Sequence, residues 1–333
     1  MTSGSMTGAR RMDIGDSPDV LAGRATRRPD DYRSSVRPEP GAGKVRGTFA
    51  RRFLAPPRGE LFLGVASALG WGIGVAAVVV MATWTTMGSD AEAYWLATRH
   101  LLEGGALYER SNVAADGAYF YPPLFAQLWA PLAFLPREVF VWAFRLAGFL
   151  SLRYLAGSWR NVGLWMLIPL TVGELSRANV TFPVAAMSLA ALRGRGWLAP
   201  WAGALKFGPF LLIPYLWFRG DRRHVITGCV SLGLAGLLSV ALSPGAWAEY
   251  AGAMTSLSGS NGGHADLIQI IPSVGMDFAL RFGVGFVLVL LAAFRGWPTI
   301  AYGVSVLAVP TLWTSRLVPL LALPRLVPRY RWR

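Results

Sequence analysis

The chain has 333 residues, of which 53% are hydrophobic and only 15% are charged. Soluble domains usually contain about 25% charged residues, and the apolar residues here occur in long blocks, which excludes a soluble globular protein. The net charge of +14 comes largely from arginines in an N-terminal tail and in short turns between apolar blocks. This is the charge distribution of a membrane protein, so we expect a lipid bilayer and no nucleic acid as a partner.

The first 59 residues are polar, rich in Arg, Gly, Pro and Ser, and lack hydrophobic periodicity. Such a composition predicts a disordered tail, and its arginines place the tail in the cytoplasm. Arg51-Arg52 faintly resembles a twin-arginine export signal, but the apolar run that follows is too long for a signal sequence. We therefore predict an uncleaved first span from about Leu61 to Thr85 that crosses from inside to outside.

Further apolar blocks follow a polar outer loop at 89–121, and a second long outer loop is expected at 244–278. The blocks are 123–136, 139–157, 162–175, 180–193, 197–218, 225–243, 279–294 and 298–323. Several are shorter than the roughly 17 residues that a spanning helix needs, so some must be half-spans or re-entrant pieces buried in protein. The expected fold is an all-α, polytopic membrane helix bundle over 60–328, followed by a basic tail at 329–333.

The arginines also predict where individual blocks reverse. Arginine clusters at 193–195 and 219–223 flank the block 197–218, and both favour the cytoplasmic side. The block should therefore leave that side and return to it, turning near Lys206 where Gly208 and Pro209 break the helix. A cytoplasmic C terminus likewise requires a break near 310–319.

The first candidate for chemistry is Asp90, directly after the first span. A carboxylate at the outer mouth of a helix bundle can act as a general base. A structural explanation competes with this one, because Ser89 with Glu92 forms a capping-box pattern and Asp suits a helix start. The helix that begins here carries Tyr94 and Trp95 on its apolar face, which predicts that it lies along the outer interface.

Lys206 is the second candidate, because a lysine within an apolar block is costly and marks a functional site by default. A buried ammonium also needs an anionic partner, either a bound phosphate or a carboxylate from another segment such as Glu174. Snorkelling to an interface is the alternative. Glu174, Arg177 and Asn179 form a polar turn between two short blocks, which is either a site or a loop. In the second outer loop His264 lies in a Gly- and Ser-rich stretch that also contains Asn261 and Asp266.

The order of motifs in the first outer loop resembles glycosyltransferase family 87. Asp90 is followed by Tyr94, then by Gly104-Gly105-Ala106-Leu107-Tyr108, and then by Tyr121-Pro122-Pro123. The family pattern there is an Asp, a Tyr one turn later, a Gly-x-x-Leu-Tyr and a Tyr-Pro-Pro. Downstream, Asn179 before a short apolar block and Lys206-x-x-Pro209 also resemble the family.

Members of this family are polyprenol-phosphate-sugar-dependent mannosyltransferases with the membrane GT-C fold. The resemblance therefore implies a GT-C-like bundle that moves a sugar, expected to be mannose, from a polyprenyl-phosphate donor to an envelope glycolipid or glycan acceptor. It implies inversion on the outer face, with Asp90 as general base and Lys206 or Arg177 at the departing phosphate. Substrate-binding roles are expected for Tyr94, Tyr108, Tyr121, Asn179 and His264.

The chain departs from the family pattern at Ser176-Arg177-Ala178-Asn179, where members commonly show Gly-Gln-x-Asn, and members tend to be longer. A non-catalytic family member is therefore one alternative. The other is a polytopic transporter or lipid flippase, which predicts internal symmetry that the sequence does not show. No cofactor is expected; metal dependence stays open, because one Asp and scattered carboxylates do not define a metal site. The scarcity of lysine beside abundant Ala and Gly indicates a GC-rich bacterial genome, hence a bacterial plasma membrane.

Overall fold

The computed structural model describes residues 58–83, 89–108, 119–259, 269–271, 276–309 and 312–327. The predictions for the tail up to residue 57, for His264 and for the last residues of the chain lie outside this part. The helices are α1 (Arg58–Thr83), α2 (Ser89–Glu103), α3 (Pro123–Trp129), η4 (Ala130–Leu132), α4 (Arg137–Ala156), α5 (Trp159–Met166), α6 (Pro169–Ser176), α7 (Thr181–Leu192), α8 (Leu198–Leu205), η5 (Gly208–Leu211), α9 (Leu212–Phe218), α10 (Arg222–Leu242), α11 (Pro244–Gly259), α12 (Met276–Arg295), α13 (Pro298–Leu307) and η6 (Thr314–Arg325).

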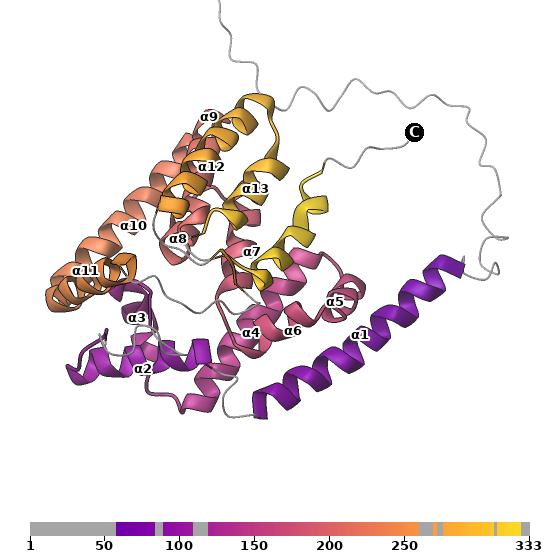
Figure 1. The fold of residues 1–333 in the computed structure, drawn as a ribbon, viewed down its shortest axis with the longest axis horizontal. Coiled ribbons are helices and arrows are strands. Elements are labelled where there is room, and N and C mark those ends of the chain that lie inside the picture. Colours follow the sequence, from indigo (N-terminus) through magenta and orange to yellow (C-terminus); the bar gives the residue numbers. More distant parts are fainter. Residues whose placement is uncertain are drawn as a thin grey trace, which may run out of the picture. The chain divides into compact units, whose positions relative to one another are not determined.

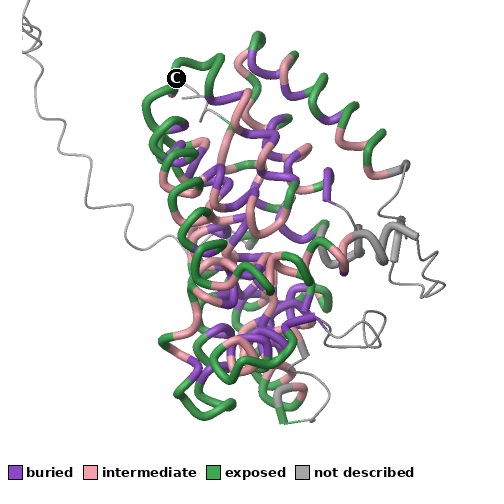
Figure 2. Tube along the Cα trace, turned by 90° about the vertical axis from the view of Figure 1, so that its left-hand side faces the viewer, coloured by how far each residue is buried: buried purple, intermediate pink, exposed green. Residues whose placement is uncertain are grey.

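The predicted all-α, polytopic bundle is confirmed (Figure 1). Four helices in the described part are long and apolar enough to cross a membrane, within α1, α4, α10 and α12. In Figure 2 buried positions gather where helices meet and exposed positions line the outward faces. Many of the exposed residues are large and apolar, which suits faces that meet lipid rather than water.

Two regions of the predicted apolar blocks form broken helices. α6 and α7 together are apolar enough for one span, but the pair is bent by 105°. The block 197–218 is divided into α8, η5 and α9, with the break at Lys206, as the charge pattern predicted. The side chain of Asp221, which follows α9, packs against Gly196, which precedes α8. The two ends of this block therefore lie together, which confirms that it returns to the side it left.

The first span is joined to the bundle at a close helix crossing with α5. A β-carbon at Gly70 would overlap the backbone carbonyl of Gly163, so the two backbones touch only because both residues lack side chains. Such small-residue contacts hold membrane helices together by close packing. Nearby, Ser67 Oγ donates to the carbonyl of Arg160 at 2.9 Å and Trp71 Nε1 donates to that of Trp159 at 3.1 Å. Figure 1 shows α1 lying beside α5.

The end of the chain is also broken, as predicted. α13 stops at Leu307, and the 3₁₀ helix η6 follows with prolines at 319 and 324. The two helices pack on each other, and Tyr302 Oη donates to the carbonyl of Pro319 at 3.2 Å. A short antiparallel pairing of β1 (Gln269–Ile271) with β2 (Leu312–Trp313) is the single strand pairing in the described residues.

Candidate functional site

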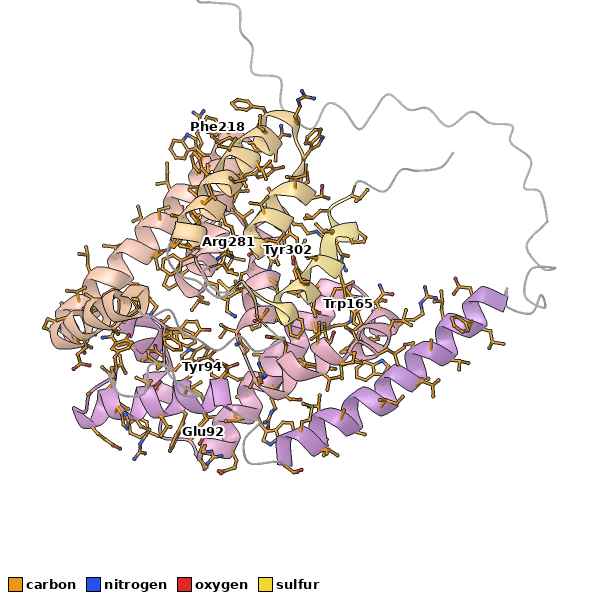
Figure 3. All side chains as sticks on the ribbon, viewed as in Figure 1. Glu92, Tyr94, Trp165, Phe218, Arg281 and Tyr302 are labelled. Carbon is orange, nitrogen blue, oxygen red and sulfur yellow. The ribbon has the colours of Figure 1, made fainter. Side chains whose placement is uncertain are left out.

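Asp90 lies in the first turn of α2, and an aromatic cluster holds that helix in place. Tyr94, one turn after Asp90, is only 2% exposed and donates through its hydroxyl to the hydroxyl of Tyr121 at 3.1 Å. Its ring meets those of Tyr121 and Phe125 edge-on, with centroids 5.2 and 5.1 Å away. Figure 3 shows Tyr94 on α2. Because Pro123 starts α3 with a fixed φ, the cluster fixes α2 against α3 and so sets where Asp90 can lie.

The break between α6 and α7 brings a second polar group to Asp90. Ala178 has a φ of +53°, the left-handed region that costs a residue with a β-carbon about 1–2 kcal/mol. Arg145 of α4 is buried and donates through Nε and Nη2 to the carbonyl of Ser176, at 3.3 and 3.2 Å. These two features turn the chain sharply after α6 and present Asn179 towards α2. Strained backbone of this kind is common at functional sites.

Asn179 connects the two candidates that the sequence singled out. Its Nδ2 donates to Oδ2 of Asp90 at 2.7 Å. Its Oδ1 accepts from Nζ of Lys206 at 2.7 Å and from the hydroxyl of Thr181 at 2.9 Å. The orientation of the amide is therefore fixed, because Nδ2 of Asn179 can only donate and Oδ1 can only accept. A carboxylate and an ammonium are thus held on opposite sides of one amide.

Lys206 occupies the break between α8 and η5, with an extended backbone at φ −151° and ψ 87°. Besides Asn179, its Nζ donates to Oγ1 of Thr181 at 2.8 Å. Two of the three donors of the ammonium are therefore used by neutral oxygens of the described residues. The close packing of η5 on α13, where a β-carbon at Gly208 would overlap the carbonyl of Ser305, keeps this break inside the bundle.

A small cavity of about 30 Å³ adjoins the ammonium of Lys206. One face of α7 forms one wall, with Thr181, Val184 and Ser188 at helical spacing. Ser305 at the end of α13 and Val309, which follows this helix, also line the cavity. The cavity is thus polar at the Lys206 end and mainly apolar along the rest of its lining.

Tyr108 holds the segment that follows α2 against α11. The backbone N–H of Leu107 donates to Oε2 of Glu249 at 2.9 Å, and the ring of Tyr108 lies 5.5 Å from that of Tyr250. The pKa of Tyr108 is raised well above its usual value, mainly because the phenol is buried. The nearby Tyr250 and Glu249 raise it further. The Tyr108 phenol therefore stays protonated, and its hydroxyl donates to the carbonyl of Tyr121.

Other expectations for the site have different outcomes. Of the two anionic partners expected for Lys206, a phosphate or a carboxylate such as Glu174, the structure does not supply Glu174. Lys206 bonds to neutral oxygens, because the turn after α6 brings Asn179 rather than Glu174 to it. Glu174 is buried, and its Oε2 has no hydrogen-bond partner in the described part. Arg177 is exposed at the end of α6, on the turn that carries Asn179. The side chain of Ser89 lies outside the described residues, so the capping box stays a prediction.

Sequence reasoning missed three residues near this site: Thr181, Glu249 and Arg281. Thr181 carries no charge, and Glu249 and Arg281 lie in helices where a single charge usually faces an interface. Each becomes visible only through a contact with a residue far away in the chain. Among the described residues no three His, Cys, Asp or Glu side chains are grouped closely enough to hold a metal ion.

The model of glycosyltransferase family 87 matches residues 119–331. Tyr121, Arg177, Asn179 and Lys206 lie within the matched region, whereas Asp90, Tyr94 and Tyr108 precede it. No curated protein and no solved structure matches the chain.

Proposed function

Because the chain belongs to glycosyltransferase family 87, and is therefore a membrane glycosyltransferase, we propose that it transfers mannose from a polyprenyl-phosphate donor. The acceptor is an envelope glycolipid or glycan on the outer face of the bacterial plasma membrane, and the configuration at the anomeric carbon is inverted. In this proposal five residues bind the substrate. They are Tyr94, Tyr121 and Asn179, together with Tyr108 and His264 on the two outer loops. Of the tyrosines, half-buried Tyr121 offers more surface to a substrate than Tyr94 or Tyr108.

The contact of Asn179 with both Asp90 and Lys206 carries this proposal. Transfer from a sugar phosphate needs a base at the acceptor hydroxyl and positive charge at the departing phosphate, on opposite sides of the anomeric carbon. Asp90 and Lys206 supply these two charges, and Asn179 keeps them apart so that they do not neutralise each other directly. A simple structural ion pair would have placed the ammonium on the carboxylate itself.

In the proposed reaction the acceptor oxygen attacks the anomeric carbon while Asp90 takes its proton. The bond between the anomeric carbon and the phosphate oxygen breaks, and its electron pair leaves with the polyprenyl phosphate. Lys206, and Arg177 on the neighbouring turn, stabilise the negative charge that the phosphate gains. One displacement inverts the anomeric configuration, and no nucleotide is consumed because the lipid phosphate is the leaving group.

The test is a transfer assay with polyprenyl-phosphate [³H]mannose and lipid acceptors in membranes that contain the protein. Removal of a general base typically lowers the rate about 10²–10⁴-fold, so Asp90→Asn should lose most activity. Glu92→Gln is the matched control, because Glu92 lies in the same helix turn but pairs with Arg137. Full activity of Asp90→Asn would assign Asp90 to helix capping and remove the base from the proposal.

The proposed sidedness has a separate test. In a Cys229→Ala background, a cysteine at Ser89 should react with a membrane-impermeant thiol reagent in intact cells, since it follows an inside-to-outside span. A cysteine at Ser34 should react only after the membrane is permeabilised. Labelling at position 34 of intact cells would place Asp90 on the cytoplasmic side and contradict an outward-facing site.

A further inference from the structure

Arg281 is a charged residue within a predicted span. It lies in α12, whose residues Phe278–Arg295 are long and apolar enough to cross a membrane. Ionisable residues in such segments are costly and mark ligand or ion sites by default. Arg281 is half-buried, whereas Arg295 at the other end of the helix stacks over the ring of Trp297.

The helix face that carries Arg281 packs against the break at Lys206. Phe278 meets the ring of Phe207, the residue after Lys206, with centroids 6.1 Å apart. Two turns further on, Gly285 packs against Leu211 at the end of η5. Residues at 278, 281 and 285 lie on one face of a helix, so Arg281 faces the same break between these two contacts.

A hydrogen bond brings Arg281 to the wall of the cavity at Lys206. Its Nη1 donates to the carbonyl oxygen of Val309 at 3.1 Å. Val309 lines that cavity together with Lys206 and Thr181. Figure 3 shows Arg281 on α12 and Tyr302 on α13, the helix that leads to Val309. Val309 therefore links Arg281 of α12 to the lining of the cavity that Lys206 also lines.

We propose that Arg281 is a further phosphate-binding residue, which together with Lys206 selects the dianionic product over the monoanionic donor. This inference rests on the proposed function for the identity of the phosphate. The donor is a phosphodiester with one negative charge, and breaking its anomeric bond leaves a monoester with two charges near neutral pH. The guanidinium keeps its charge at all physiological pH values and presents several donors in a plane that matches phosphate oxygens.

A further cation at the phosphate accelerates the reaction through this difference in charge. An interaction that is stronger with the departing phosphate than with the bound donor lowers the barrier, whereas equal binding of both does not. Lys206, already bonded to Asn179, is placed to hold the donor. Arg281 then stabilises the additional negative charge that the phosphate gains as the anomeric bond breaks.

The experiment compares two synthetic probes, farnesyl phosphate and methyl farnesyl phosphate, binding to the purified full chain in lipid nanodiscs at pH 8. The first is a dianion and the second a monoanion with the same prenyl chain. Wild type should bind farnesyl phosphate about tenfold or more tightly than the diester. Arg281→Gln should weaken farnesyl phosphate binding about 10- to 100-fold, as expected for lost charge-assisted bonds, and diester binding about threefold at most. Arg295→Gln should match wild type with both probes.

Two results would overturn the inference. If Arg281→Gln keeps the wild-type preference for farnesyl phosphate, residues other than Arg281 account for the selection. If wild type itself binds the two probes equally, the selection does not exist, and this result stands even when Arg281→Gln fails to fold. The proposed function can fail separately. If the preference for farnesyl phosphate depends on Arg281 but the protein does not transfer mannose from polyprenyl-phosphate mannose, the phosphate site stands and the proposed donor is wrong.

Discussion

A change at Asn179 tests the proposed site through a single replaced group. In Asn179→Asp the Nδ2 donor that lies 2.7 Å from Asp90 becomes a carboxylate oxygen. A hydrogen bond to a charged group contributes about 1.5–3 kcal/mol, and about 1.4 kcal/mol corresponds to a factor of ten. Loss of this bond alone therefore predicts a drop in transfer rate of about 10- to 100-fold at pH 8.

The same variant predicts a particular pH profile. Two carboxylates at hydrogen-bond distance repel each other, which raises the pKa of the pair. Below that raised pKa one proton is shared between them, and the hydrogen bond between positions 90 and 179 forms again. The rate of Asn179→Asp relative to wild type should therefore recover as the pH falls from about 8 towards about 6.

The assay is mannose transfer in membranes, followed across this pH range at matched protein levels. Asn161→Asp is the control for the substitution itself, because Asn161 Nδ2 donates to the carbonyl of Ala156 in the turn before α5. It should show the wild-type pH profile. If Asn179→Asp stays within twofold of wild type at pH 8, the amide does not position Asp90 and the reasoning is refuted.

Three further predictions concern the ammonium of Lys206, the first span and the segment that follows α2. Lys206→Arg should retain part of the transfer activity and Lys206→Met should lose most of it, because only the former keeps a cation for the phosphate; equal rates of the two variants in the transfer assay would contradict this role. Gly70→Leu should lower the thermal unfolding temperature in detergent, because the new side chain separates α1 from α5. Gly72→Leu on the same helix, with no neighbour within 4 Å, should not. Glu249→Ala should cost about 1–3 kcal/mol by leaving the buried N–H of Leu107 unpaired; an unchanged unfolding temperature would show that the loop finds another acceptor.

Much of the helical framework could be predicted from the sequence. The span α1 follows from an uninterrupted apolar run, and the return of the block 197–218 follows from arginines at both of its ends. These predictions work because the bilayer imposes a minimum length on a spanning helix and a charge preference on its flanks. Span length and flanking charge do not predict which helices pack together.

The residues of the candidate site were singled out one by one, but their arrangement was not predicted. Asp90, Asn179 and Lys206 were each singled out, yet their mutual contacts join positions up to 89 residues apart. Such contacts depend on the sharp turn at Ala178, where nothing in the residue type announces a positive φ. Glu174 was the more obvious partner for a lysine by charge, but the turn exposes the amide to Lys206 instead.

The crossing of α1 with α5 has a consequence for how the protein is made. The glycine that receives Gly70 lies 93 residues later in the chain, so at about 5–20 residues per second the ribosome supplies it about 5–20 seconds afterwards. During that interval α1 has to persist in the bilayer alone, which its length and freedom from charge after Glu60 allow. Until α5 has been made, the glycine face of α1 is therefore exposed to lipid. Any other membrane helix with a small-residue face can compete for this face during synthesis.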